Sequence, residues 1–189
     1  MAEVLLLHSA LGLRPGVLRA ADRLRSAGHR VTAPDLYDGQ VFDHPDQGVP
    51  HMTWIGWDRL VARAEAAAAG IDGPFAVVGM SLGAGLASHL VGARRGITGA
   101  VLLYAGEVPE RPWPLGVPVQ VHHTIDDPWA DVTASSALVA SAARNGSRSE
   151  LHLYPGGRHL LDDSDLPDHH DRVAAALMWP RVEGFLASL

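Results

Sequence analysis

Short apolar runs of strand length alternate along the chain with longer, alanine-rich segments that predict helices. The runs are almost continuously apolar, which is typical of strands that are buried on both faces of a sheet. Predicted strands cover residues 4–8, 29–33, 75–79, 98–104, 117–123 and 151–154. Predicted helices lie between Pro15 and Gly28 and over residues 54–69, 81–93, 131–144 and 171–189. The stretch 37–53 is rich in Pro, Gly, Asp and His, and we expect it to be a loop.

This alternation of strands and helices predicts an α/β fold with a mostly parallel, six-stranded sheet covered by helices on both faces. The chain shows no internal repeat, low-complexity tract or linker-like stretch. Its 189 residues are close to the usual size of one compact domain, so we expect residues 1–189 to form a single domain.

Composition narrows the classes of partner. The formal net charge of −6 argues against nucleic acid or an anionic membrane surface as the main partner. The chain contains no cysteine, which excludes a disulfide framework, a thiolate zinc site and a cysteine nucleophile. No stretch reaches the roughly 18 apolar residues of a membrane span, and the first residues lack the features of a signal peptide. We therefore expect a soluble, cytoplasmic protein.

One motif carries candidate chemistry. Residues 79–83 read Gly-Met-Ser-Leu-Gly, follow an apolar predicted strand and open a predicted helix. G-x-S-x-G in that setting is typical of a nucleophile elbow, in which a strained turn exposes a serine hydroxyl above the sheet. The simpler alternative is that Ser81 only caps the helix in a glycine-rich turn. The strand and helix on either side favour the nucleophile.

A serine nucleophile needs a base, and His159 is the best-placed candidate. It lies in the loop after the last predicted strand, and catalytic groups gather in loops at the carboxyl ends of parallel strands. The remaining histidines are more simply explained as structural or solvated residues. The two neighbours His122 and His123 lie at the end of a strand and should point to opposite faces of the sheet.

An acid should come between the serine and the histidine in chain order, and Asp126 and Asp127 both qualify. Two backbone N–H groups should stabilise the developing oxyanion: that of Leu82, directly after Ser81, and most plausibly that of Ala10. The alternative for the Ala10 loop is an ordinary strand-to-helix turn.

Aromatic side chains from the 37–57 region and near Trp129 are candidates for the substrate cleft. We single out Tyr37, Trp54 and Trp129, although core positions explain them equally well. The chain has no H-E-x-x-H motif, no other recognisable metal-ligand set and no phosphate-binding glycine motif. We expect neither a metal nor a cofactor, and the sequence does not indicate an oligomeric state.

Over nearly its whole length, the chain resembles the dienelactone hydrolase family. The resemblance rests on Gly12, on Pro-Asp-Leu-Tyr at 34–37, on the elbow at 79–83, on Asp-Pro at 127–128, and on residues 154–159. The closing helix is similar as well. The resemblance implies a minimal α/β-hydrolase fold with the strand order 2-1-3-4-5-6, lacking the two antiparallel strands that often begin this fold. It also favours Asp127 over Asp126, because Asp127 directly precedes the proline.

Three positions depart from the family's pattern. The typical nucleophile of the family is cysteine, whereas this chain has Ser81. Ser9 matches an acidic residue of the first oxyanion loop. An arginine that holds a substrate carboxylate is expected shortly after His159 but is replaced near Asp163. Short neutral esters should therefore be better substrates than carboxylate-bearing ones.

We therefore expect a serine hydrolase that cleaves small carboxylic esters, lactones or thioesters through an acyl-serine intermediate. The alternative is a hydrolase-fold protein that binds a small molecule with little or no turnover. A third possibility is a scaffold or oligomer-forming protein, which no feature of the sequence favours.

Overall fold

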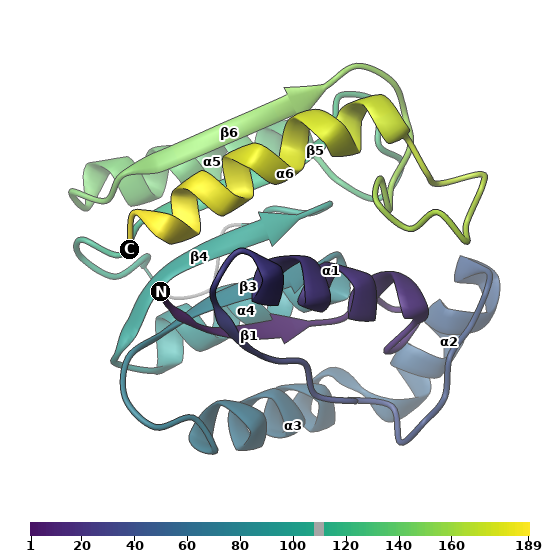
Figure 1. Ribbon diagram of the computed structural model, residues 1–189, viewed down its shortest axis with the longest axis horizontal. Coiled ribbons are helices and arrows are strands. Elements are labelled where there is room, and N and C mark those ends of the chain that lie inside the picture. Colours follow the sequence, from purple (N-terminus) through teal and green to yellow (C-terminus); the bar gives the residue numbers. More distant parts are fainter. Residues whose placement is uncertain (108–111) are drawn as a thin grey trace.

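The computed structural model describes residues 1–107 and 112–189. Six strands form one sheet in the order β2-β1-β3-β4-β5-β6, and all five neighbouring pairs are parallel (Figure 1). The strands are β1 (Glu3–Leu7), β2 (Arg30–Thr32), β3 (Phe75–Met80), β4 (Ile97–Leu103), β5 (Val119–Thr124) and β6 (Ser149–Tyr154). The predicted strand order and the predicted parallel sheet are both confirmed.

Helices cover both faces of the sheet, as predicted. They are α1 (Pro15–Ser26), α2 (Pro45–Ile55), α3 (Trp57–Ala69), α4 (Leu82–Ala93), α5 (Val132–Arg144) and α6 (Arg172–Ala187). One apolar core packs α1 and α6 against β1, β3 and β4, with Leu6 and Val78 among its buried side chains. The other packs α3, α4 and α5 on the opposite face, around Leu5 and Val77. The alternating residues of β1 and β3 thus supply both cores, which explains their continuously apolar sequences.

The predicted loop over residues 37–53 is wrong in its second half. Pro45–Ile55 forms α2, and the predicted helix 54–69 is divided at Gly56, whose φ is +85°. Proline and glycine hid this short helix from the sequence pattern, yet proline fits the first turn of a helix because its missing N–H is not needed there. Gly48 lets α2 approach the loop after β1, since a Cβ there would lie 2.4 Å from the carbonyl oxygen of Ala10.

The arrangement gathers several loops at the carboxyl ends of the strands. In Figure 1 the strand arrows point the same way, toward the side where α2 and the segment before α6 lie. In an open parallel sheet this edge is where ligands bind.

Candidate active site

Ser81 occupies a strained turn between β3 and α4. Its φ of 53° and ψ of −111° are rare for a residue with a side chain. Both motif glycines are required by close backbone contacts. A Cβ on Gly79 would lie 2.1 Å from the carbonyl oxygen of Gly83, and one on Gly83 would lie 2.2 Å from that of Leu7. The motif therefore allows β3, α4 and β1 to approach closely enough to hold this turn.

His159 lies within hydrogen-bonding distance of both Ser81 and Asp127. The Ser81 Oγ is 2.9 Å from His159 Nε2, and His159 Nδ1 is 2.8 Å from Asp127 Oδ2 and 2.9 Å from Oδ1. An ionised carboxylate accepts hydrogen bonds, so Nδ1 donates to Asp127 and Nε2 is left to accept from the serine hydroxyl. This arrangement can transfer the serine proton to the imidazole. Asp126 is exposed and its side chain does not reach the ring, whereas Asp127 is buried.

The loops after β5 and β6 are joined by backbone contacts that position these side chains. The Asp126 N–H donates to the Gly156 carbonyl at 3.0 Å, and the Thr124 hydroxyl donates to the Arg158 carbonyl at 2.8 Å. Asp127 also accepts a bond from the backbone N–H of Trp129 at 2.9 Å. The carboxylate and the imidazole are thus fixed in relation to each other before any ligand binds.

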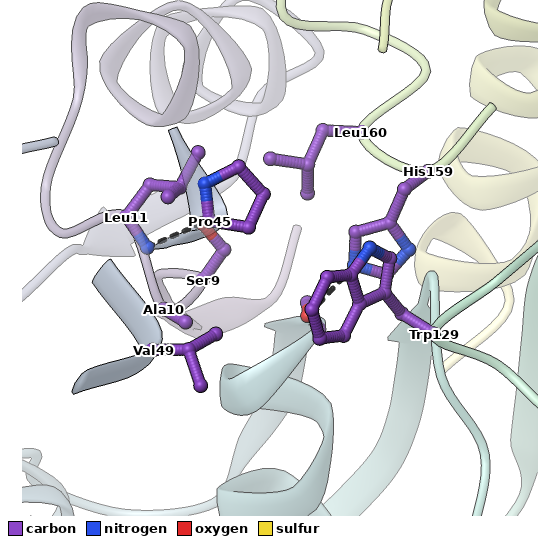
Figure 2. A pocket seen from close by; sticks show the side chains of 9 residues that line it. Ser9, Ala10, Leu11, Pro45, Val49, Trp129, His159 and Leu160 are labelled. Atoms are coloured by element: carbon purple, nitrogen blue, oxygen red, sulfur yellow. Dashed lines mark hydrogen bonds between the residues drawn. The ribbon is translucent and has the colours of Figure 1, made fainter. Parts of the chain in front are cut away.

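A cavity of about 30 Å³ opens beside Ser81 and His159 (Figure 2). It is lined by Ser9, Ala10, Leu11, Pro45, Val49, Ser81, Trp129, His159 and Leu160. The side chains of Val49 and Leu160 bring apolar walls to it from α2 and from the loop after β6. This volume is far below the roughly 300–1,000 Å³ of pockets that hold drug-sized ligands.

Ala10 lines this cavity, and Leu82 directly follows Ser81, which also lines it. Within the described ranges the backbone N–H groups of Ala10 and Leu82 donate to no protein acceptor, which leaves both free for an oxygen atom. Leu82 is the first residue of α4, where N–H groups have no partner inside the helix.

The loop that carries Ala10 is fixed by its neighbours. Ser9 Oγ accepts from the Leu11 N–H at 3.2 Å, and His8 Nε2 accepts from the Leu36 N–H at 3.0 Å. His8 Nδ1 can then donate to the Ser9 carbonyl, 2.7 Å away. Burial lowers the pKa of His8, which favours this neutral form.

Of the three predicted substrate-contacting aromatics, Trp129 alone lines the cavity. Its ring centroid lies 6.3 Å from that of His159. Tyr37 is instead buried in the core with its ring edge-on to His8 at 4.8 Å, and Trp54 is 76% exposed on α2, stacked on His51. Neither Tyr37 nor Trp54 lines this cavity, because Tyr37 packs into the core and Trp54 lies on the exposed side of α2. Pro45 and Val49, which lie four residues apart on α2, line the cavity instead.

Asp163, near the position where the resemblance leads us to expect an arginine, forms a buried ion pair with Arg14. Arg14 Nε donates to it at 3.1 Å and Arg19 donates to it at 3.0 Å. Arg14 also donates to Asp43 and to the Phe42 carbonyl. Gly16 leaves room for this carboxylate, since a Cβ there would lie 2.3 Å from its carbon. Arg14 is the arginine nearest in sequence to the loop after β1, and its guanidinium is engaged by this cluster of Asp163, Asp43 and the Phe42 carbonyl.

Among residues 1–107 and 112–189, no group of three His, Cys, Asp or Glu side chains could hold a metal ion. None of the helices in this part of the chain is long and apolar enough to cross a membrane.

A family model described as the dienelactone hydrolase family matches residues 1–189. The chain belongs to this family. A lactone is a cyclic ester, and membership makes the protein a hydrolase that acts on ester bonds. No curated protein is significantly similar to the chain in sequence.

Several solved structures share the fold of this family member. A promiscuous phosphotriesterase from metagenomic libraries, described as dienelactone hydrolase-like, is 22% identical, with a TM-score of 0.83 over 100% of this chain and 87% of that one. A propionate-bound thermophilic esterase from the Planctomycetes species Thermogutta terrifontis is 16% identical, with a TM-score of 0.71 over 99% and 83%. An α/β-hydrolase from a Medee basin deep-sea metagenome library is 18% identical, with a TM-score of 0.62 over 100% and 86%.

Proposed function

We propose that this family member is a serine hydrolase that cleaves short, neutral carboxylic esters, lactones or thioesters through an acyl-serine intermediate. The observation that carries the proposal is the continuous hydrogen-bonded chain from Ser81 Oγ through His159 to the buried Asp127. Serine becomes a competent nucleophile when a base removes its proton, and a carboxylate stabilises the imidazolium that results.

In the proposed reaction, Ser81 Oγ attacks the ester carbonyl carbon while His159 Nε2 takes the hydroxyl proton. The carbonyl oxygen becomes an oxyanion, and the N–H groups of Ala10 and Leu82 donate hydrogen bonds to it. The C–O bond to the alcohol then breaks, and His159 returns the proton to the departing oxygen. Water attacks the acyl-serine with the same base, which releases the acid and restores the hydroxyl of Ser81.

The size and lining of the cavity support a short, uncharged acyl group. Its walls near Ser81 include Val49, Leu160 and Trp129, and Trp129 is the aromatic side chain that we expect to contact the substrate. The cations that could hold a substrate carboxylate are engaged elsewhere, since Arg14 binds Asp163 and Arg158 donates to the Pro167 carbonyl. A small-molecule ester fits the net charge of −6 better than nucleic acid or an anionic membrane, and we propose a cytoplasmic location.

Labelling by a fluorophosphonate probe tests the proposal, because such probes react with activated serines. We expect the wild type to be labelled once and to hydrolyse p-nitrophenyl acetate, and Ser81→Ala to lose both properties while remaining folded. Ser88→Ala is the matched control: Ser88 lies on the same helix, buried and without a hydrogen-bond partner for its hydroxyl in the described chain. Turnover by folded Ser81→Ala would overturn the assignment. An unlabelled, inactive wild type would favour the non-catalytic binding protein instead.

A further inference from the structure

Tyr104 has an unusual backbone conformation beside the proposed catalytic residues. Only three non-glycine residues in the described chain have positive φ: Asp38, Ser81 and Tyr104, the last with φ of 66°. Strained residues of this kind cluster at functional sites, and Ser81 is the proposed nucleophile. Tyr104 directly follows β4, and its side chain is wholly buried. Its conformation therefore calls for an explanation in terms of what the side chain contacts.

The Tyr104 side chain connects β4 to the loop that carries His159. Its hydroxyl donates to Asp162 Oδ1 at 2.6 Å, and Asp162 lies three residues after His159 in the chain. Its ring meets the imidazole of His159 edge to face, with the centroids 5.9 Å apart. The same residue thus contacts the proposed base and holds the segment that follows it.

Asp162 depends on this hydroxyl because the nearby arginines are used by its neighbour. Arg14 and Arg19 both bind Asp163, and the Tyr104 hydroxyl is the side-chain donor to Asp162 among the residues described. Asp162 and Asp163 therefore anchor the loop in two directions, toward β4 and toward α1. Tyr104, which anchors the loop to β4, also contacts the imidazole of His159.

We propose that Tyr104 and Asp162 are a positioning pair that holds His159 Nε2 within reach of Ser81, and that protonation of Asp162 weakens this hold. The inference rests on the proposed serine mechanism. When Asp162 is ionised, the bond from Tyr104 is charge-assisted, and such bonds are roughly twice as strong as neutral ones. Protonation of the carboxyl replaces it with a neutral bond.

Several groups set the charge of Asp162. Burial is the main cause that raises the pKa of Asp162 to about 6, and the negative charge of Asp163 raises it further. The hydrogen bond from Tyr104, the backbone N–H of Asp162 itself and the positive charge of Arg19 oppose this rise. Arg14 acts on the cluster through Asp163, the imidazole of His159 faces the ring of Tyr104, and His169 packs edge-on against His159 with the ring centroids 6.4 Å apart. Asp162 is thus mostly ionised above about pH 6 and gains its proton below.

The sign of the effect on stability differs from that on activity. The folded-state pKa of Asp162 is above its ordinary value of 3.8, so the folded state binds more protons than the unfolded chain between about pH 4 and 6. This group therefore favours folding as pH falls through that range. A loss of activity in the same range cannot come from destabilisation of the fold by Asp162.

The test measures kcat and KM against pH for Tyr104→Phe and Asp162→Asn, with active sites counted by fluorophosphonate labelling. We expect kcat to fall about tenfold in each variant with KM changed less than about twofold, as for a displaced catalytic group. Wild-type kcat should fall more steeply below about pH 6 than kcat of Asp162→Asn, because only the wild type has a carboxylate at position 162 that takes up a proton there. Tyr104→Phe should show the same change in the acid limb as Asp162→Asn, because the bond that protonation of Asp162 weakens is absent from both variants.

Tyr154→Phe is the matched control, because it removes another buried tyrosine hydroxyl. That hydroxyl is bonded to His122 at 2.8 Å and to Arg181 at 3.2 Å, and we expect its loss to leave kcat and the pH profile unchanged. Wild-type kcat and an unchanged profile in folded Tyr104→Phe would overturn the inference, as would equal effects in Tyr154→Phe. If Asp162→Asn does not fold, Tyr104→Phe alone decides. Failure of wild-type labelling would instead refute the serine mechanism itself.

Discussion

At the scale of single residues, the chain has two pairs of neighbouring aspartates, and the two side chains of each pair point in different directions. Asp127 is turned inward to His159 while Asp126 is exposed, and Asp162 binds Tyr104 while Asp163 binds two arginines. In each pair the backbone sends consecutive side chains to different surroundings. Neighbouring carboxylates of identical chemistry therefore differ in their expected effect on catalysis, which makes each a control for the other.

Replacing the two aspartates of the first pair separates the proposed acid from its neighbour. Asp127→Asn keeps the shape of the side chain but removes the charge that stabilises the imidazolium and allows the wrong histidine tautomer. We expect kcat to fall on the order of 10³- to 10⁴-fold. Asp126→Asn should cost about tenfold or less. The measurement is kcat on one activated ester for both folded variants. If Asp126→Asn loses activity instead, Asp126 is the acid that orients His159. If both variants stay active, the acid is a different residue.

At the scale of elements, the elbow at Ser81 depends on close contact between the backbones of β1, β3 and α4. Glycine at positions 79 and 83 leaves room for this contact. Gly83, the second residue of α4, packs directly against the end of β1. The carbonyl oxygens of Leu7 and His8 lie 2.2 and 2.8 Å from the position that a Cβ on Gly83 would occupy. Backbone atoms cannot move aside as a flexible side chain can. Close packing, rather than local helix preference, therefore decides which residue this position tolerates.

Two glycine-to-alanine changes within helices should consequently have opposite effects. Gly184 lies exposed in α6 with open space around its Cβ position, so Gly184→Ala should raise the free energy of unfolding by about 0.5–1 kcal/mol. Gly83→Ala should lower it by about 1–3 kcal/mol, because the added methyl group overpacks the elbow. Urea unfolding of both variants provides the comparison. A Gly83→Ala variant as stable as wild type would show that the elbow can expand.

The sequence predicted the elements whose pattern is local. Continuous apolar runs identified β1 and β3, and a glycine-flanked serine between a strand and a helix identified the elbow. Helix α2 was missed because Pro45, Gly48 and Pro50 obscure its periodicity, and its stability comes from packing on the loop after β1. The bond from Tyr104 to Asp162 spans 58 positions, and that from Arg14 to Asp163 spans 149. No local pattern indicates pairs that form only after the sheet is assembled.

At the scale of the whole molecule, the parallel sheet brings distant segments to one edge. The loops after β1, β3, β5 and β6 contribute Ala10, Ser81, Asp127 and His159, and all four strands end on the same side. The protein that surrounds this edge carries a net charge of −6, and the arginines next to it are engaged by carboxylates or carbonyls. Charge at this edge therefore opposes an anionic substrate in two ways, through the overall field and through the lack of a free partner in the described site.

A neutral ester should accordingly react faster than an anionic ester with an acyl chain of the same length. p-Nitrophenyl butyrate and the p-nitrophenyl monoester of succinate have the same leaving group and four-carbon acyl chains, but the second carries a carboxylate. We expect kcat/KM to be at least about tenfold higher for the neutral ester, because the cavity offers the carboxylate no counter-ion. Added salt should raise kcat/KM for the anionic ester by screening long-range repulsion, and leave the neutral ester unaffected. A preference for the anionic ester that salt weakens would instead require a cation at the cavity, and Arg14→Gln and Arg158→Gln would then show whether either arginine leaves its partner to supply it.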